Sequence, residues 1–114
     1  MKTYYVANER ITRTHKRLAF EGGSEQIRYD YSGFAEDNGT ISAVTISVES
    51  GDSSISAESL AANVKSFTVT SSNAGKSLLK LTATAGANID VQWLEIWVKS
   101  LTTEAVSDYG LVST

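Results

Sequence analysis

Few residues in this chain combine the type and the spacing that catalysis or cofactor binding requires. Gly75-Lys76-Ser77 matches the end of a phosphate-binding loop, whose backbone N–H groups surround the phosphate. Such a loop needs a glycine five residues before Gly75, where this chain has Thr70, and a helix after it, where the residue pattern is that of a strand. We therefore predict no phosphate site at this motif.

Histidine, cysteine and the acidic residues offer no better candidate. The only histidine is His15 and there is no cysteine, so a metal site would need carboxylates for its other ligands, and a Ser-His-Asp triad would depend on a basic N-terminal segment. Glu36, Asp37, Asp52 and Asp90 fall in or beside predicted loops without the spacing of a calcium loop. We predict no catalytic residue, no metal and no cofactor.

Trp93 and Trp97 are the residues best suited to binding. The apolar residues of the run 94–98 alternate onto one face of a predicted strand, so both tryptophans share the opposite face with Glu95. Only one of these faces can pack into the core of a two-layer fold. The tryptophans therefore either form a contact surface or are covered by a neighbouring loop or by the chain's own termini, and the pattern leaves both readings open.

A predicted hairpin over residues 76–99 positions these tryptophans. Two runs of β-forming residues flank Ala85-Gly86-Ala87-Asn88, which is typical of a hairpin loop that contains glycine. Apolar residues alternate along both runs, as expected of strands that cover a core. The residues predicted to face that core are Leu79, Leu81, Ala83, Leu94, Ile96 and Val98.

Five more strands are predicted before the hairpin. They lie at 16–21, 26–31, 40–49, from Ile55 through 56–62, and at 63–70. The segment 32–39 is predicted as a loop, and a single helical turn is the alternative for 56–62. No segment has a sustained period of 3.6 residues. The sequence therefore predicts an all-β fold, an immunoglobulin-like two-sheet sandwich of about seven antiparallel strands with extended N- and C-terminal arms; a small barrel is the alternative.

Length and charge suggest one domain with two arms. The 114 residues can bury a core without cross-links, and no segment resembles a membrane span or an export signal, so we expect a soluble protein compatible with a reducing cytoplasm. The net charge is −3, yet five of the 10 basic residues lie within the first 20 positions. We expect a basic arm at 1–15, the sandwich at 16–99 and a C-terminal arm at 100–114. The basic arm would bind an acidic neighbour or another copy rather than nucleic acid, because the acidic body would repel phosphate.

Two stretches of the chain resemble a set of short proteins from tailed bacteriophages. They are YDYSGFAEDNGTISAVTISVESGDSSIS and NVKSFTVTSSNAGKSLLKLTATAGANIDVQWLEIWV, and the resemblance covers roughly residues 26–99. It rests on an aromatic-acidic-aromatic-Ser strand end, a Gly-Thr-Ile entry into a long strand, and a Thr-rich hairpin before an alternating last strand. The resemblance implies an immunoglobulin-like virion component that decorates a capsid or forms part of a tail or fibre. This chain departs from it at Trp93 and Trp97, where the last strand of those proteins commonly carries polar residues.

We therefore predict a non-enzymatic phage structural protein that binds the assembled virion as a capsid decoration or cement protein. Its partners would be the major capsid protein or another virion protein, together with further copies of itself, and neither a membrane nor nucleic acid. It would be made in the host cytoplasm and reside in the virion. The residues predicted to contact the partner are Tyr4, Tyr5, Arg10, Arg13, Lys16, Arg17, Trp93, Trp97 and Tyr109.

Two other functions stay open at the level of sequence. One is a tail or fibre module that binds a carbohydrate or a receptor, in which exposed Trp and Tyr rings would stack on sugars. The other is a hydrolase with a pair of carboxylates, although no pair has an aromatic-lined setting that would single it out.

Overall fold

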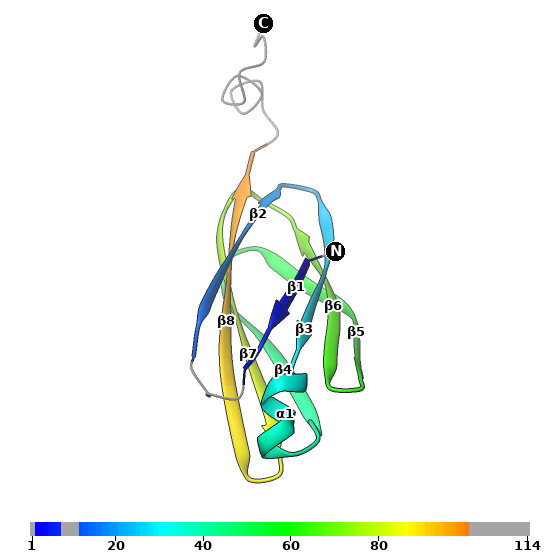
Figure 1. Cartoon of the computed structure of the whole chain (residues 1–114). Helices are drawn as coiled ribbons and strands as arrows, with labels where there is room; N and C mark the ends of the chain where they lie inside the picture. Colours follow the sequence, from blue (N-terminus) through cyan, green and yellow to red (C-terminus); the bar gives the residue numbers. More distant parts are fainter. Residues whose placement is uncertain (1, 8–11, 101–114) are drawn as a thin grey trace, which may run out of the picture.

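The computed structural model of the protein describes residues 2–7 and 12–100, which form eight strands and one short helix (Figure 1). In chain order the elements are β1 (Lys2–Tyr5), β2 (Thr14–Phe20), β3 (Ser24–Asp30), α1 (Ser32–Asn38), β4 (Ala43–Ser50), β5 (Ser53–Ala61), β6 (Val64–Ser71), β7 (Gly75–Ala85) and β8 (Asn88–Lys99). The predicted all-β class is therefore confirmed.

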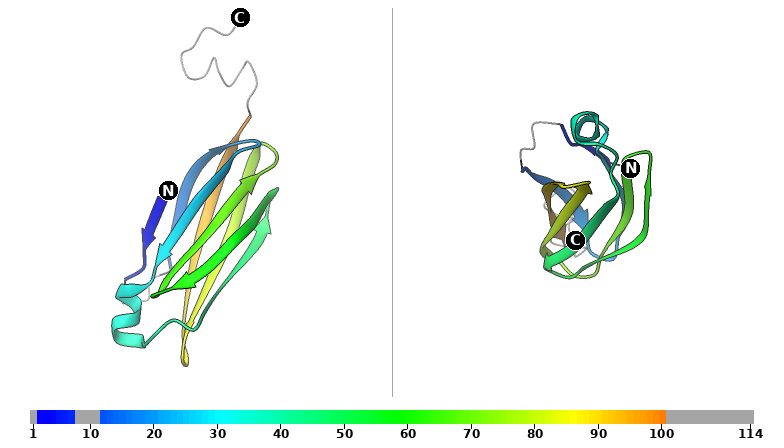
Figure 2. Two further views of the ribbon diagram at one scale, coloured as in Figure 1. Left: turned by 90° about the vertical axis from the view of Figure 1, so that its right-hand side faces the viewer. Right: turned by 90° about the horizontal axis from the view of Figure 1, so that it is seen from below.

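The strands form two four-stranded sheets that pack face to face (Figure 2). Their orders are β1-β3-β6-β5 and β2-β8-β7-β4, which confirms the immunoglobulin-like two-sheet sandwich with eight described strands instead of about seven. The prediction that all strands are antiparallel is wrong at two pairs, because β1 runs parallel to β3 and β2 runs parallel to β8. Neither pair is joined by a hairpin, so no tight turn imposes the antiparallel direction.

Part of the predicted N-terminal arm belongs to this sandwich. Residues 2–5 form β1 at the edge of one sheet, and residues 14 and 15 begin β2 at the edge of the other. The Tyr4 side chain points into the core from β1 and is buried. The first strands are therefore held by apolar burial as well as by backbone pairing.

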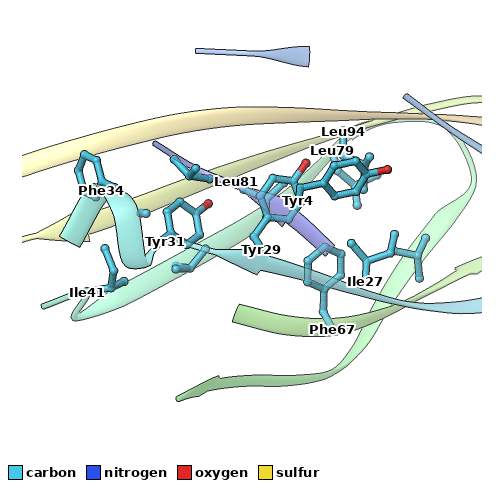
Figure 3. Packing of buried hydrophobic residues seen from close by; sticks show 14 of the residues in the cluster. Tyr4, Ile27, Tyr29, Tyr31, Phe34, Ile41, Phe67, Leu79, Leu81 and Leu94 are labelled. Atoms are coloured by element: carbon cyan, nitrogen blue, oxygen red, sulfur yellow. The ribbon is translucent and has the colours of Figure 1, made fainter. Parts of the chain in front are cut away.

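The core lies between the two sheets and follows the period of two that strands impose (Figure 3). All six hairpin residues predicted to face inward are buried, which confirms that part of the pattern. Phe67 and Val69 of β6 are buried opposite them, as their alternation indicates. The side chains of Tyr29 and Tyr31 lie at the centre of the same cluster, with no exposed surface.

The prediction of a loop at 32–39 is wrong, because residues 32–38 form the helix α1. Ala35 donates its N–H to the carbonyl of Tyr31, and Gly39 donates to the carbonyl of Ala35. The side chain of Phe34 is fully buried and anchors this helix to the end of the core. Seven residues make barely two turns, which is too short to produce a recognisable helical period among Ser, Gly and Asn.

The uncertain segment after Ile55 is a strand, β5, and not a helical turn. Its pairing with β6 shifts register between Ser56 and Ser59, and Ala57 has a positive φ of 51° there. This irregularity is a β-bulge, which explains why the residue pattern is weak at this point. The strand ends in a two-residue turn whose residues, Ala62 and Asn63, both have positive φ, as a type I′ hairpin turn requires.

The turn at Gly51 leads to a stability prediction. Its φ is +90°, and a Cβ atom added there would lie 2.6 Å from the Ser77 Cα and 2.7 Å from the Lys76 carbonyl oxygen. Gly39 has a similar φ of +98°, but a Cβ added there meets nothing within 4 Å. We expect Gly51→Ala to lower the free energy of unfolding by about 1–3 kcal/mol more than Gly39→Ala, because only Gly51→Ala adds a steric clash to the backbone strain.

Urea unfolding followed by tryptophan fluorescence measures both variants under one condition. Equal losses in the two proteins would show that the backbone around Ser77 relaxes without cost and would contradict the prediction.

Candidate functional site

The tryptophans of β8 lie on the outward side of the sheet β2-β8-β7-β4. Along β8 the side chains of Leu94, Ile96 and Val98 are buried, so the residues between them point away from the core. Trp93 is half-buried and Trp97 is 49% exposed. The alternation predicted for this strand is therefore confirmed, and part of the Trp97 side chain is accessible to solvent.

Strand pairing adds residues from β2 and β7 to the tryptophans. In the register of the sheet Leu18 lies beside Trp97 and Phe20 beside Lys99, and on the other side of β8 Lys76 lies beside Trp97. We call this surface the aromatic face. It consists of Lys16, Leu18, Phe20, Lys76, Leu78, Lys80, Trp93, Glu95, Trp97 and Lys99.

The apolar part of the aromatic face is accessible. Leu18 is 49% exposed and Phe20 is 36% exposed, and both lie on β2 next to the last residues of β8. Together with Trp97 they form a contiguous group contributed by two neighbouring strands. Exposed apolar groups of this kind, with charged residues around them, are typical of protein-binding surfaces.

Charged side chains hold the two indole rings in place. The Trp97 Nε1–H donates a 2.6 Å hydrogen bond to Glu95 Oε1, and the Lys76 ammonium lies 3.8 Å from Glu95 Oε2. Lys76 Nζ also lies 5.5 Å from the centre of the Trp97 ring, and Lys80 Nζ lies 5.7 Å from that of Trp93, within the range of cation–π attraction. These contacts restrict the rotation of the rings before any partner arrives.

The opposite sheet presents a different surface. Its outward residues on β3 and β6 are mainly polar, for example Ser24 and Thr70, whose hydroxyl groups share a 2.9 Å hydrogen bond. Tyr5 is the large exception, because its side chain on β1 is 73% exposed. The two faces of the sandwich therefore offer different chemistry, and the basic and aromatic residues gather on the β8 side.

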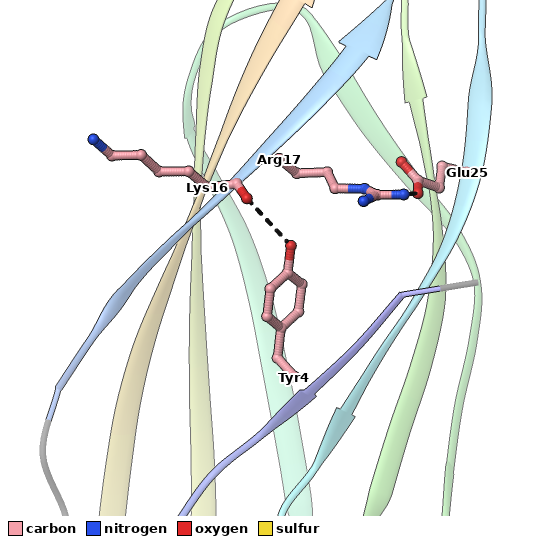
Figure 4. A network of polar contacts seen from close by, with 4 residues as sticks. All are labelled: Tyr4, Lys16, Arg17 and Glu25. Atoms are coloured by element: carbon pink, nitrogen blue, oxygen red, sulfur yellow. Dashed lines mark hydrogen bonds and ion pairs between the residues drawn. The ribbon is translucent and has the colours of Figure 1, made fainter.

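Tyr4, which we predicted as a partner contact, is instead a core residue. Its side chain is only 7% exposed, its ring lies 4.6 Å from that of His15 and 5.1 Å from that of Tyr29, and its hydroxyl donates to the carbonyl of Lys16 (Figure 4). The sequence could not distinguish Tyr4 from Tyr5, because the start of the chain has no clear period. Burial of the first and exposure of the second follow from the pairing of β1 with β3.

The predicted basic contacts are divided by the structure. Lys16 is exposed on the aromatic face, whereas Arg17 points to the inner side of β2 and forms an ion pair with Glu25 across the edge of the sandwich (Figure 4). Arg13 is exposed, but its backbone is bonded to β8, since its carbonyl accepts a 2.9 Å hydrogen bond from the backbone N–H of Trp93. Arg10 and Tyr109 lie outside the described residues.

Sequence reasoning missed Leu18, Phe20, Lys76 and Lys80 as members of the aromatic face. Their alternation along β2 and β7 contained a signal, since all four fall in the outward phase of a strand. What the pattern lacked was the identity of the neighbouring strand. Only the pairing of β2 and β7 with β8 brings them beside the tryptophans.

No group of three or more His, Cys, Asp or Glu residues that would suit a metal occurs in the part of the chain that the structure describes. Within the same ranges, no helix has the length and apolarity needed to cross a membrane. His15, the histidine of this chain, shares a 3.0 Å hydrogen bond with the hydroxyl of Tyr29 and stacks near Tyr4, so it has a structural environment.

Comparison with known proteins supports the fold of this chain but identifies no function. No protein-family model and no curated protein sequence matches the chain. Among solved structures it is similar to a cysteine protease inhibitor from Entamoeba histolytica, with a TM-score of 0.51, 9% identity, and coverage of 86% of this chain and 96% of that one. A chimeric titin Z1Z2 gives a TM-score of 0.51 at 18% identity, over 77% of this chain and 87% of that one.

An endo-fucoidan hydrolase of glycoside hydrolase family 107 is also similar, with a TM-score of 0.50 at 17% identity. The match covers 76% of this chain but 13% of the hydrolase. The inhibitor and the titin domains are non-enzymatic proteins, and the hydrolase is an enzyme. At these levels of sequence identity the similarities show a shared immunoglobulin-like sandwich and do not assign a function to this chain.

The environment of His15 leads to a prediction about pH. Burial in the aromatic cluster, reinforced by the charge of Arg13, lowers the pKa of His15 below its usual value of 6.5. Between the native pKa and about pH 6.5, His15 is protonated in the unfolded chain but neutral in the native protein. The contribution of neutral His15 to the free energy of unfolding is therefore complete above about pH 6.5 and is lost as the pH falls below that value. We expect the urea midpoint to fall on going from about pH 7.5 to about pH 5.5.

The matched variant is His15→Gln, which keeps a polar side chain but cannot titrate. Its urea midpoint should change less over the same pH interval. An equal change in both proteins would assign the pH dependence to other groups.

Proposed function

We propose that this chain is a non-enzymatic structural protein that binds an assembled protein surface through its aromatic face. Its resemblance to short proteins of tailed bacteriophages supports a virion as that assembly, with the major capsid protein or another virion protein as the partner. The protein would then be made in the host cytoplasm and reside in the virion. The observation that carries the proposal is the partly exposed apolar group of Leu18, Phe20 and Trp97, with lysines on the neighbouring strands.

The charges of the aromatic face indicate the chemistry of the partner. Lys16, Lys76, Lys80 and Lys99 lie on it with a single acidic residue, Glu95, although the chain as a whole has a net charge of −3. A basic surface on an acidic protein favours an acidic partner, and like-charge repulsion disfavours contact between the aromatic faces of two copies. The proposed partner surface is therefore acidic at its rim and contains an apolar depression for the Trp97 ring.

A surface of this size suits repeated binding on a lattice. Tryptophan is among the residues that most often dominate the binding energy of an interface, because its large rigid ring loses little entropy when it is buried. Copies that sit on neighbouring sites of a regular shell, and that also touch one another, gain effective concentration. Modest affinity per copy is then sufficient for full occupancy.

Replacement of the exposed indole tests this proposal. We expect Trp97→Thr to reduce binding to particles that lack the endogenous protein by at least about tenfold, because loss of a buried hot-spot aromatic commonly costs 2 kcal/mol or more. Threonine suits a strand, and Thr82 and Thr84 of β7 already occupy this side of the same sheet. Co-sedimentation of purified protein with the particles, over a range of protein concentrations, measures the change.

Tyr5, which the sequence predicted as a contact, lies on the opposite sheet and so outside the aromatic face, and Tyr5→Thr is therefore the matched control that removes an exposed aromatic ring there. It should leave particle binding unchanged. If Tyr5→Thr weakens binding as much as Trp97→Thr, the interface is not the aromatic face alone. If neither variant loses affinity while both retain the native circular dichroism spectrum, the proposed function is wrong.

The exposed indole of Trp97 also favours one alternative, a carbohydrate-binding tail or fibre module. Sugar rings stack on an open aromatic face, whereas the Lys76 ammonium lies over the ring of Trp97 in this structure. Lys76→Ala separates the two functions because it uncovers the ring and removes a positive charge. We expect this variant to bind particles more weakly, with the largest difference at low ionic strength, where attraction to an acidic partner is strongest. Stronger binding to immobilised glycans, and unchanged binding to particles, would favour the alternative.

A further inference from the structure

The two sides of the sandwich, where the edges of its sheets meet, differ in structure. On the side formed by β1 and β2 the rings of Tyr4 and His15 lie against each other, and a cavity of about 240 Å³ on the same side is lined in part by Arg17 and Glu25. The other side is formed by β4 and β5, the last strands of their sheets (Figure 2). Among the described residues, no strand pairs with the outer edge of β4 or of β5.

Apolar side chains that face the core become more exposed along β4. Val44 is 6% exposed, Ile46 is half-buried and Val48 is 37% exposed. Val48 is paired with Leu79 of β7, whose side chain is fully buried, so both point to the same face of the sheet. Ile55 on the edge strand of the other sheet is also only half-buried. This side of the sandwich therefore leaves core-facing apolar groups partly accessible.

Three of the four edge strands have features that hinder pairing with another chain. β1 is only four residues long, β2 carries Lys16 and Arg17, and the β-bulge of β5 at Ala57 interrupts its edge. In β4, by contrast, residues Ala43–Val48 are uncharged, contain no proline and pair with β7 in one continuous register. Uncharged edges of this kind are the ones that accept a strand from another chain.

The edge of β4 is remote from the ends of the described ranges. Residues 2, 7 and 12 belong to or adjoin β1 and β2, on the opposite side of the sandwich, and residue 100 follows β8, two strands away within the sheet. β4 itself lies well inside the continuously described range 12–100.

We propose that β4 pairs antiparallel with β4 of a second copy, so that two four-stranded sheets join into one continuous sheet. A two-fold axis at Ile46 sets this residue opposite Ile46 of the second copy, and Val44 opposite Val48 of that copy. Residues opposite each other lie on the same face of a sheet, so the partly accessible apolar side chains of each copy would cover those of the other.

The charge distribution favours a second copy as the occupant. Each chain has a net charge of −3, yet this pairing sets no charged residue of β4 opposite another. Glu49 would lie opposite Ala43 of the second copy, about 20 Å along the strand from the other Glu49, which exceeds the Debye length of about 8 Å at physiological ionic strength. An uncharged apolar edge is complementary to itself, as an interface on a two-fold axis requires.

The dimer would present both aromatic faces on the same side of the joined sheet, because a two-fold axis perpendicular to a sheet keeps every residue on its own side. Two aromatic faces directed at one particle surface would bind it bivalently and gain effective concentration. This consequence rests on the proposed function, whereas the dimer itself does not.

Cysteine cross-linking tests the pairing at its axis, because the chain has no cysteine of its own. Ile46→Cys would bring two cysteines opposite each other, with Cα atoms about 4.5–5.5 Å apart, a separation that a disulfide can bridge. We expect mild oxidation to convert this variant into a covalent dimer on a non-reducing gel. Ile89→Cys is the matched control, since Ile89 is 53% exposed on β8, two strands from β4, and it should stay monomeric on the gel. Equal cross-linking of the two variants, or none of Ile46→Cys, would overturn the proposal.

Sedimentation equilibrium of the full chain supplies a second measurement. We expect a wild-type dimer that dissociates on dilution, and a dissociation constant at least about tenfold higher for Val48→Lys, because a lysine on an edge strand opposes pairing. Ile89→Lys adds the same charge away from this edge and should leave the dimer unchanged.

A wild type that is monomeric at every concentration, as expected if another segment of its own chain covers β4, would overturn the proposal. So would a dimer that Val48→Lys does not weaken, and the cross-link decides the matter if Val48→Lys fails to fold. No particle is present in either experiment. Failure of the dimer therefore leaves the binding of particles by the aromatic face to its own test with Trp97→Thr.

Discussion

The structure depends most on the pairing of β8 with a neighbour on each side. This strand pairs with β7 from Asn88 to Val98 and with β2 from Trp93 to Lys99, without a break in register. Because side chains alternate with a period of two, a slip of one residue would exchange the apolar residues that face the core with the tryptophans. The same register therefore forms the core on one side of the strand and the aromatic face on the other. It also places Leu18 and Lys76 beside Trp97.

A second constraint acts between the sheets at the N-terminal edge. β1 and β2 belong to different sheets, and their side chains Tyr4 and His15 meet over Tyr29 in the space between them. This contact closes one half of the sandwich edge. The other half, beyond the start of β1, contains the cavity and the Arg17–Glu25 pair. The ring contacts and the cavity therefore occupy different halves of the same edge.

Much of the fold was predictable from residue alternation, and the failures have physical causes. The inward residues of β6, β7 and β8 were predicted because long strands repeat the pattern several times. Helix α1 was missed because its seven residues bury one apolar side chain, Phe34, and so display no period. The parallel direction of β1 and β2 was missed because alternation is the same for parallel and antiparallel strands. Tyr4 was predicted as a contact residue, yet its burial depends on β3, which lies more than 20 residues away in the chain.

The sequence by itself determined the strand content, the two-layer architecture and the outward direction of Trp93 and Trp97, since these follow from the order of neighbouring residues along one strand. Only the tertiary structure decided which residues surround the tryptophans, which half of the sandwich edge contains the cavity, and that Arg17 lines this cavity while Lys16 joins the aromatic face. These features arise from contacts between strands that are distant in sequence. The energy of such contacts depends on strand order and direction, and a local residue pattern contains neither.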